Sequence, residues 1–174
     1  MLNVVCLIVA RNEEKHIEKT IKSINLQSIK INHIVLVDDG STDETPYIAY
    51  RLGCLLIQLP YHEVSYVGRP ELSLKWNSGL RFIKLLGIPD YILLMGADHV
   101  LNNDYVEIII NGMKDSKIKI ASGIIENVGY AGRLPIGSGR IVDAHFWNKI
   151  GDFKYPFSYG WESWLLYKAE LLGF

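Results

Sequence analysis

Two adjacent acids, Asp38 and Asp39, directly follow the apolar run at residues 34–37 and precede Gly40. Glycine allows the backbone to turn tightly at this point. A carboxylate at the end of a buried strand can accept a hydrogen bond from a nucleotide base N–H or from a ribose hydroxyl. An ordinary strand-to-helix loop fits the same pattern, so the residues alone leave both interpretations open.

A third acid, Asp98, follows the apolar run at residues 91–95. Mg²⁺ is often held by one or two carboxylates together with water and substrate phosphates, and Mn²⁺ also accepts imidazole. We therefore expect Asp98 to bind a divalent cation, although it could instead cap the next helix. His99 is a less favoured ligand, because neighbouring side chains on an extended backbone point in opposite directions.

The elements that must position these acids alternate along the chain. Apolar runs predict strands at residues 4–9, 34–37, 55–59, 91–95 and 118–125. Helical patterns follow Asn12 and a capping box at residues 41–44, and they also cover residues 72–86, 103–113, 143–150 and 161–172. Such alternation predicts a mostly parallel sheet covered on both faces, with ligands at the carboxyl ends of its strands.

Composition limits the range of functions. The 174 residues suit a single domain, and 18 basic against 19 acidic residues argue against a nucleic-acid surface. Cys6 and Cys54 lie in apolar runs and are expected to be reduced core residues. The apolar start is too short for an anchor and lacks a basic region, so we expect a cytoplasmic protein. Peripheral docking of apolar helices on a membrane stays open.

The segments VARNEEKHIEKTIKSINLQS and VLVDDGSTDET resemble the start of a family 2 glycosyltransferase of the GT-A fold. Weaker landmarks at residues 75–79, 96–98 and 160–174 extend the resemblance along the chain. It implies a Rossmann-like α/β domain over residues 1–174, with a nucleotide-binding half at about 1–98 and an acceptor half at about 99–174. The end of the chain suggests a minimal or truncated form of that domain.

The resemblance also implies a donor site for a UDP- or GDP-sugar. It assigns nucleotide binding to Ala10, Arg11, Asn12, Glu13, Asp38, Asp39, Lys75, Asn77, Ala97 and Asp98. Trp76 stands where the family commonly has arginine, and we expect it to be a core residue. Lys75 or Arg69 would then supply the cation that faces the donor phosphates.

Two departures from the family pattern affect the catalytic residues. The family's metal motif is Asp-x-Asp, whereas residues 96–98 keep only Asp98, and the family's frequent late histidine ligand would be His145. The resemblance places Glu162 at the position of the catalytic base, or Ser163 in a register shifted by one residue. We prefer Glu162, because more of the surrounding residues then agree with the family.

The expected activity is inverting, metal-assisted transfer of a sugar to a hydroxyl of a glycan, a lipid or a small molecule. The alternative is a catalytically degenerate sugar-nucleotide-binding module, suggested by Gly96 and Trp76. A sugar-phosphate nucleotidyltransferase is disfavoured, because the loop at residues 10–13 lacks the glycines that such enzymes place after their first strand.

Overall fold

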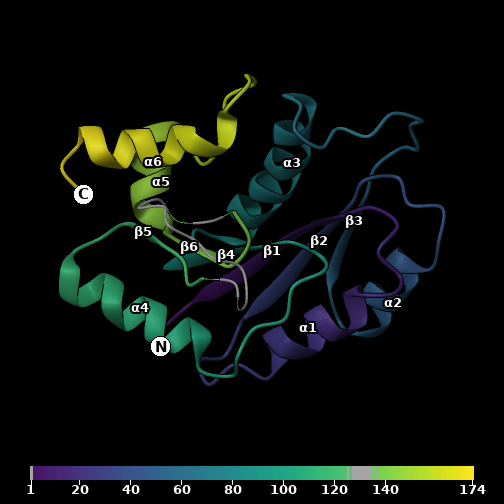
Figure 1. The fold of residues 1–174 in the computed structure, drawn as a ribbon, viewed down its shortest axis with the longest axis horizontal. Coiled ribbons are helices and arrows are strands. Elements are labelled where there is room, and N and C mark those ends of the chain that lie inside the picture. Colours follow the sequence, from purple (N-terminus) through teal and green to yellow (C-terminus); the bar gives the residue numbers. More distant parts are fainter. Residues whose placement is uncertain (1, 125, 127–134, 136) are drawn as a thin grey trace.

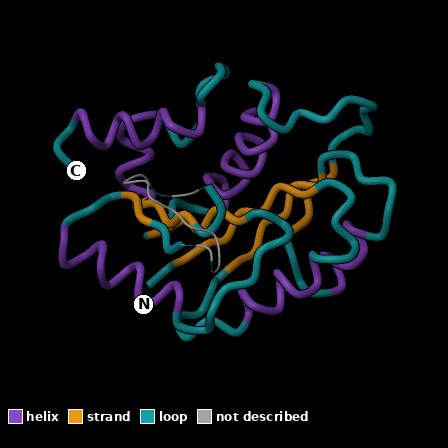
Figure 2. Tube along the Cα trace, in the orientation of Figure 1, coloured by secondary structure: helices purple, strands orange, loops and turns teal. Residues whose placement is uncertain are grey.

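A six-stranded sheet lies between two layers of helices in the computed structural model, which describes residues 2–124, 126, 135 and 137–174 (Figures 1 and 2). The strands are β1 (Val4–Ala10), β2 (His33–Asp38), β3 (Leu55–Gln58), β4 (Tyr91–Met95), β5 (Ile120–Ala121) and β6 (Arg140–Asp143), in the order β3-β2-β1-β4-β6-β5. Strands β1 to β4 are parallel, whereas β6 is antiparallel to both of its neighbours. The predicted mostly parallel sheet is confirmed, and the carboxyl ends of β1 to β4 share one edge.

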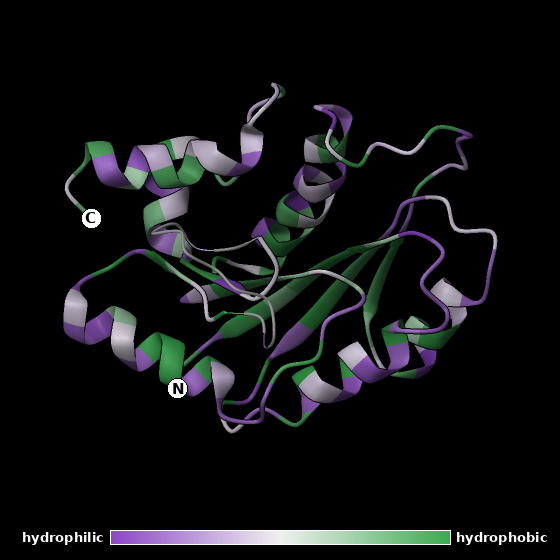
Figure 3. Cartoon of the chain, viewed as in Figure 1, coloured by the Kyte–Doolittle hydropathy of each residue, from purple (hydrophilic) through white to green (hydrophobic). Residues whose placement is uncertain are grey.

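The helices divide between the two faces as the sequence predicts. One apolar layer packs α1 (Ile17–Asn25), α2 (Thr45–Arg51) and α4 (Tyr105–Ser116) on the sheet. The other packs α3 (Glu71–Leu86), α5 (Ala144–Gly151) and α6 (Trp161–Leu171). Figure 3 shows the strands as the most apolar part of the chain, as expected for a sheet buried on both faces. Among the helices of the described residues, none is long and apolar enough to cross a bilayer.

The predicted N-caps of the first two helices, Asn12 and Ser41, are wrong. Helix α1 begins at Ile17 and α2 at Thr45, and neither has a side-chain cap. Asn12 and Ser41 instead join the two preceding loops: the Asn12 amide donates to Ser41 Oγ at 2.9 Å, and the Thr42 amide donates to Asn12 Oδ1 at 2.8 Å. Residues with good capping chemistry are thus used to hold together the loops that end β1 and β2.

The last third of the sheet also differs from expectation. The strand predicted at residues 118–125 is only Ile120–Ala121 in the described part, and Ile125 lies outside the described residues. Strand β6 was not predicted, because its short apolar pair, Ile141 and Val142, follows a glycine-rich stretch without a clear period. Helix α4 begins at Tyr105, two residues later than the sequence predicts, and Asp104 occupies its N-cap position.

Helix α3 approaches the sheet closely at Gly79. A β-carbon there would overlap Leu7 Cδ1 and lie 3.0 Å from Val37 Cγ2. We expect Gly79→Ala to lower the free energy of unfolding by about 1–3 kcal/mol, because the packed interior must shift. Urea denaturation measures this change.

Gly112, in α4, provides the matched control. It is helical, and a β-carbon at this position would meet no atom within 4 Å. Gly112→Ala should therefore raise the free energy of unfolding by about 0.5–1 kcal/mol through helix propensity. Equal effects of the two substitutions would contradict the close packing of α3.

Candidate active site at the carboxyl edge of the sheet

The two acids at the end of β2, Asp38 in the strand and Asp39 directly after it, have different surroundings. Asp38 is buried and accepts a hydrogen bond from the Ser41 amide at 3.2 Å, so its side chain closes its own turn. Asp39 is also buried, and its Oδ1 lies 2.8 Å from Lys75 Nζ and 3.0 Å from His62 Nε2. Of the two acids, Asp39 is therefore the one that contacts other polar side chains at this edge. One of its partners is Lys75, which the family resemblance assigns to nucleotide binding.

Arg11 holds the segment that follows β3. Its guanidinium donates to the backbone oxygens of His62 and Val64, and Nη1 lies 2.9 Å from His62 Nδ1. His62 in turn stacks on Tyr66 with ring centroids 4.2 Å apart, and Lys75 Nζ lies 5.0 Å from the centre of the Tyr66 ring. The side chain of Arg11 is thus directed at residues 62–64.

His62 and Tyr66 were not predicted as site residues from the sequence. The only available signal was the position of His62 just after a predicted strand, at the same edge as the acids. The turn at Gly40 explains the close approach of this segment, since a β-carbon there would lie 2.8 Å from Pro60 O and from Tyr61 Cα. Gly40 also has φ of 72°, a conformation that favours glycine.

The loop after β1 lies near Asp98. Ala10 is buried, Asn12 has φ of 57°, and the Glu13 amide donates to Thr45 Oγ1 at 2.7 Å. The pKa of Glu13 is raised, chiefly because its carboxylate is partly desolvated, and further because Asp98 repels it. The structure therefore brings Glu13 and Asp98 to the same part of the edge.

Asp98 keeps a partly exposed carboxylate after β4. Thr20 Oγ1 donates to Ala97 O at 2.8 Å and so fixes the backbone before it. Asp98 Oδ1 lies 2.8 Å from His99 Nδ1, because the backbone turns at residues 97–98 and is not extended as the opposite orientation of the two side chains would require. A β-carbon on Gly96 would lie 2.9 Å from His99 Nδ1 and 3.1 Å from Asp98 Oδ1. The two side chains thus lie close to the position that a first acid of the motif would occupy.

The structure does not bring His145 to this group. Its Nε2 lies 3.8 Å from Asp90 Oδ1, and Asp90 immediately precedes β4. Because β6 is antiparallel, Asp143 pairs with Tyr91 at the start of β4, and α5 begins at the opposite edge from Asp98. Within the described residues, no group of three His, Cys, Asp or Glu side chains could hold a metal ion.

Glu162 lines a cavity of about 180 Å³ beside the Asp98 loop. The cavity is formed by Trp76, Leu94, Gly96, Gly137, Ser138, Arg140, Tyr155, Trp161 and Glu162. Gly96 connects this cavity with Asp98, and Trp76 both lines it and packs against the core. Ser163, the alternative base, is not part of the lining.

A buried arginine positions the backbone at Glu162. Arg140 donates from Nη1 to Glu162 O at 3.1 Å and from Nη2 to Pro135 O at 3.0 Å. Burial raises the pKa of Tyr155 to about 12, an effect that Arg140 opposes and Glu162 strengthens. The Glu162 side chain itself is exposed at the first turn of α6, open to an incoming molecule.

The side-chain amide of Asn77, which the family resemblance assigns to nucleotide binding, forms its hydrogen bonds with the backbone of Tyr155. Its Nδ2 donates to Tyr155 O at 2.9 Å, and its Oδ1 accepts from the Tyr155 amide at 2.7 Å. Both polar atoms of the side chain are therefore used to tie α3 to the segment that leads into α6. In this arrangement Asn77 holds the cavity wall and does not face the donor loops.

Comparisons with known proteins agree on the family. The glycosyl transferase family 2 model matches residues 5–167. The 4,4'-diaponeurosporenoate glycosyltransferase of Staphylococcus haemolyticus is 33% identical over 101 residues, which cover 57% of this chain and 25% of that protein. Glycosyltransferase GlyA of Streptococcus pneumoniae is 28% identical over 120 residues, 69% of this chain and 16% of that protein.

Solved structures show the same fold. Mannosyltransferase PcManGT from Pyrobaculum calidifontis, in complex with GDP-Man and Mn²⁺, superposes with a TM-score of 0.75 at 17% identity over 99% of this chain and 53% of that one. S. aureus TarS 1–349, in complex with UDP, gives 0.72 at 17% identity over 98% and 55%. The chain thus spans about half of these structures and has the GT-A fold. The extent of the family match shows that the chain belongs to glycosyl transferase family 2.

Proposed function

We propose that the chain transfers a sugar from a UDP- or GDP-sugar to a hydroxyl acceptor, with inversion at the anomeric carbon. The main support is that the edge with Asp39 and Asp98 also borders the cavity with Glu162, through Gly96. The bound UDP of TarS and the GDP-Man of PcManGT, on the same fold, support a nucleotide-sugar donor. Residues up to about 98 would hold the donor, and later residues would face a glycan, lipid or small-molecule acceptor.

Asp39 and Lys75 would bind opposite ends of the donor nucleotide. The Asp39 carboxylate accepts hydrogen bonds, so it suits a base N–H or a ribose hydroxyl. Lys75 is a flexible point charge, which suits a diphosphate. Because Lys75 Nζ lies 2.8 Å from Asp39 Oδ1 in the free chain, donor binding would have to separate them or insert beside them.

The residues near Asp98 fit a divalent cation only as a partial set of ligands. Asp98 supplies a carboxylate and His99 an imidazole 2.8 Å from it, a donor set that Mn²⁺ accepts when water and donor phosphates complete the shell. A cation held there would offset the charge that develops on the leaving diphosphate. Glu13 adds negative charge to the same part of the edge and favours the cation further.

Glu162 would take the proton from the acceptor hydroxyl as it attacks. A general base is required because the attacking oxygen loses its proton in the transition state. Arg140 holds the Glu162 backbone through the carbonyl oxygen, which fixes the start of α6 at the cavity. Direct displacement by a hydroxyl on the face opposite the diphosphate inverts the anomeric centre.

A degenerate nucleotide-sugar-binding module is the second candidate. It is favoured by Gly96, since its surroundings leave little room for the missing first acid of the metal motif. The two functions differ in turnover, because a module would bind the donor without releasing its sugar.

Cation binding should depend on the nucleotide. With one carboxylate and one imidazole from the protein, we expect Mn²⁺ to bind weakly alone and at least about tenfold more tightly with UDP or GDP, because diphosphate oxygens join the shell. Isothermal titration with and without each nucleotide measures this coupling. The same titrations, followed by assay of sugar release from the preferred donor, test the proposed function.

The outcomes separate the candidates. Tight Mn²⁺ binding to the free protein would show that further ligands are present and that the Asp98 assignment is incomplete. Absence of UDP and GDP binding under every condition would overturn both candidates. Nucleotide binding with sugar release supports the transferase, and nucleotide binding without release to water or to any hydroxyl acceptor supports the module.

A further inference from the structure

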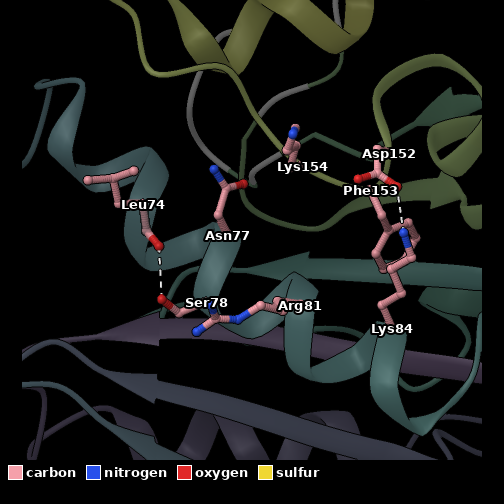
Figure 4. A pocket seen from close by; sticks show the side chains of 8 residues that line it. All are labelled: Leu74, Asn77, Ser78, Arg81, Lys84, Asp152, Phe153 and Lys154. Carbon is pink, nitrogen blue, oxygen red and sulfur yellow. Dashed lines mark hydrogen bonds and ion pairs between the residues drawn. The ribbon is translucent and has the colours of Figure 1, made fainter.

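A second cavity, of about 460 Å³, lies between α3 and the segment that follows α5. Figure 4 shows its lining from two sides: Leu74, Asn77, Ser78, Arg81 and Lys84 on α3, and Asp152, Phe153 and Lys154 on the facing segment. It is separate from the cavity of Glu162, and the two share the Asn77–Tyr155 bridge as a wall. The proposed transfer reaction makes no use of it.

The lining carries excess positive charge. Lys84 forms a salt bridge with Asp152, and this contact lowers the pKa of Asp152, with a further contribution from Lys154. The carboxyl group is therefore ionised at neutral pH and balances one of the three cations. Across residues 2–124 and 137–174, neither the Arg81 guanidinium nor the Lys154 ammonium has a salt-bridge or hydrogen-bond partner, so two positive charges remain for a ligand.

The facing segment is held in an unusual backbone conformation. Asp152 and Phe153 are consecutive non-glycine residues with φ of 50° and 61°, which is rare for phenylalanine. Phe153 is buried against Trp147, with ring centroids 5.6 Å apart, and the two hydrogen bonds of Asn77 fix the next turn. Such strain persists only where the surroundings impose it, and it is concentrated at ligand-binding segments. Here it lies directly before Lys154, which lines the cavity.

We propose that this cavity binds a phosphate group, carried by a soluble phosphate ester or by a lipid headgroup. The Arg81 guanidinium, which Figure 4 shows beside Ser78 on α3, can offer two parallel donors to phosphate oxygens, and Lys154 adds a second positive charge from the facing segment. Leu74, which is 48% exposed, provides apolar surface for the carbon part of the ester. The volume exceeds what phosphate alone requires, which favours an ester over the free ion.

Binding of two probes to the intact chain tests the proposal. Glycerol 3-phosphate is titrated calorimetrically, and co-sedimentation is measured with vesicles of phosphatidylcholine alone or mixed equally with phosphatidylglycerol. R81Q/K154Q should weaken binding of the active probe at least about tenfold, because two charged hydrogen-bond donors are lost. Asp152→Asn should strengthen it, because the only carboxylate in the lining is removed and asparagine tolerates the left-handed backbone.

The matched control is K15Q/K19Q, which removes two exposed lysines, one just before α1 and one in its first turn, on the opposite face of the sheet, and should leave both affinities unchanged. Binding of glycerol 3-phosphate that R81Q/K154Q abolishes supports a soluble ester, and vesicle binding that it abolishes supports a headgroup. Equal binding by wild type and R81Q/K154Q, or no binding of either probe to wild type, overturns the proposal. UDP or GDP binding should not change in R81Q/K154Q. A negative result for the phosphate site would therefore leave the proposed donor site unaffected, and the reverse also holds.

Discussion

Glu162→Gln is expected to reduce sugar release from the donor by about 10²- to 10⁴-fold, which is the usual contribution of a general base. Glutamine keeps the shape of the side chain but cannot accept a proton. Glu162 lines the cavity beside Gly96, and its side chain is exposed, so the substitution should leave the fold and nucleotide affinity intact. The measurement is single-turnover transfer to water or to an acceptor, at saturating nucleotide-sugar.

Two further variants sharpen this test. Glu170→Gln removes an equally exposed carboxylate from the far end of α6 and should not affect transfer. Ser163→Ala examines the register shifted by one residue and should also be silent, because Ser163 does not line the cavity. Full activity of Glu162→Gln would exclude it as the base, and loss of activity in Ser163→Ala instead would select the other register.

Asp39→Asn is expected to weaken UDP or GDP binding about 10- to 100-fold, the cost of losing a hydrogen bond to a charged group. The substitution also leaves Lys75 without the carboxylate 2.8 Å from its ammonium, so some loss of stability should accompany it. Nucleotide affinity by calorimetry and the thermal midpoint of the same samples separate the two effects.

The control for Asp39→Asn is Asp115→Asn, an identical change at an exposed position in the last turn of α4. It should alter neither quantity. Wild-type nucleotide affinity in a folded Asp39→Asn protein would show that Asp39 only positions Lys75 and His62, and the base-binding role would pass to another group at the edge.

The parallel part of the sheet could be predicted because β1, β2 and β4 are buried on both faces. Such strands are continuous apolar runs, and the run at residues 91–95 matches β4 at both ends. The alternation of strands and helices also predicted that the loops after β1, β2 and β4 lie at one edge of the sheet, as the parallel pairing of these strands shows. The N-cap predictions were wrong for a different reason. The side chains of Asn12 and Ser41 accept hydrogen bonds from the loop of the other residue, and such tertiary contacts cannot be read from local sequence preference.

His145 shows what strand direction adds. The family resemblance suggested it as a late metal ligand, but its position depends on β6, whose four residues carry too little pattern to be recognised. Because β6 is antiparallel to β4, the residue after it emerges at the far edge. The role of Asn77 was equally hidden, since its partner is the backbone of Tyr155 and a backbone partner leaves no residue-type signal.

Two hydrogen-bonded contacts hold the site together, and their different spacings along the chain predict the order in which they form during folding. The Asn12–Thr42 contact closes a loop of 30 residues, whereas the Asn77–Tyr155 contact closes one of 78. Loop closure costs more entropy as the loop lengthens, so the first contact is the easier one to form. We expect the donor-side loops to be organised early, by β1, α1 and β2 alone, and the Glu162 cavity to be completed last. Amide exchange during refolding would then protect the Thr42 amide before that of Tyr155.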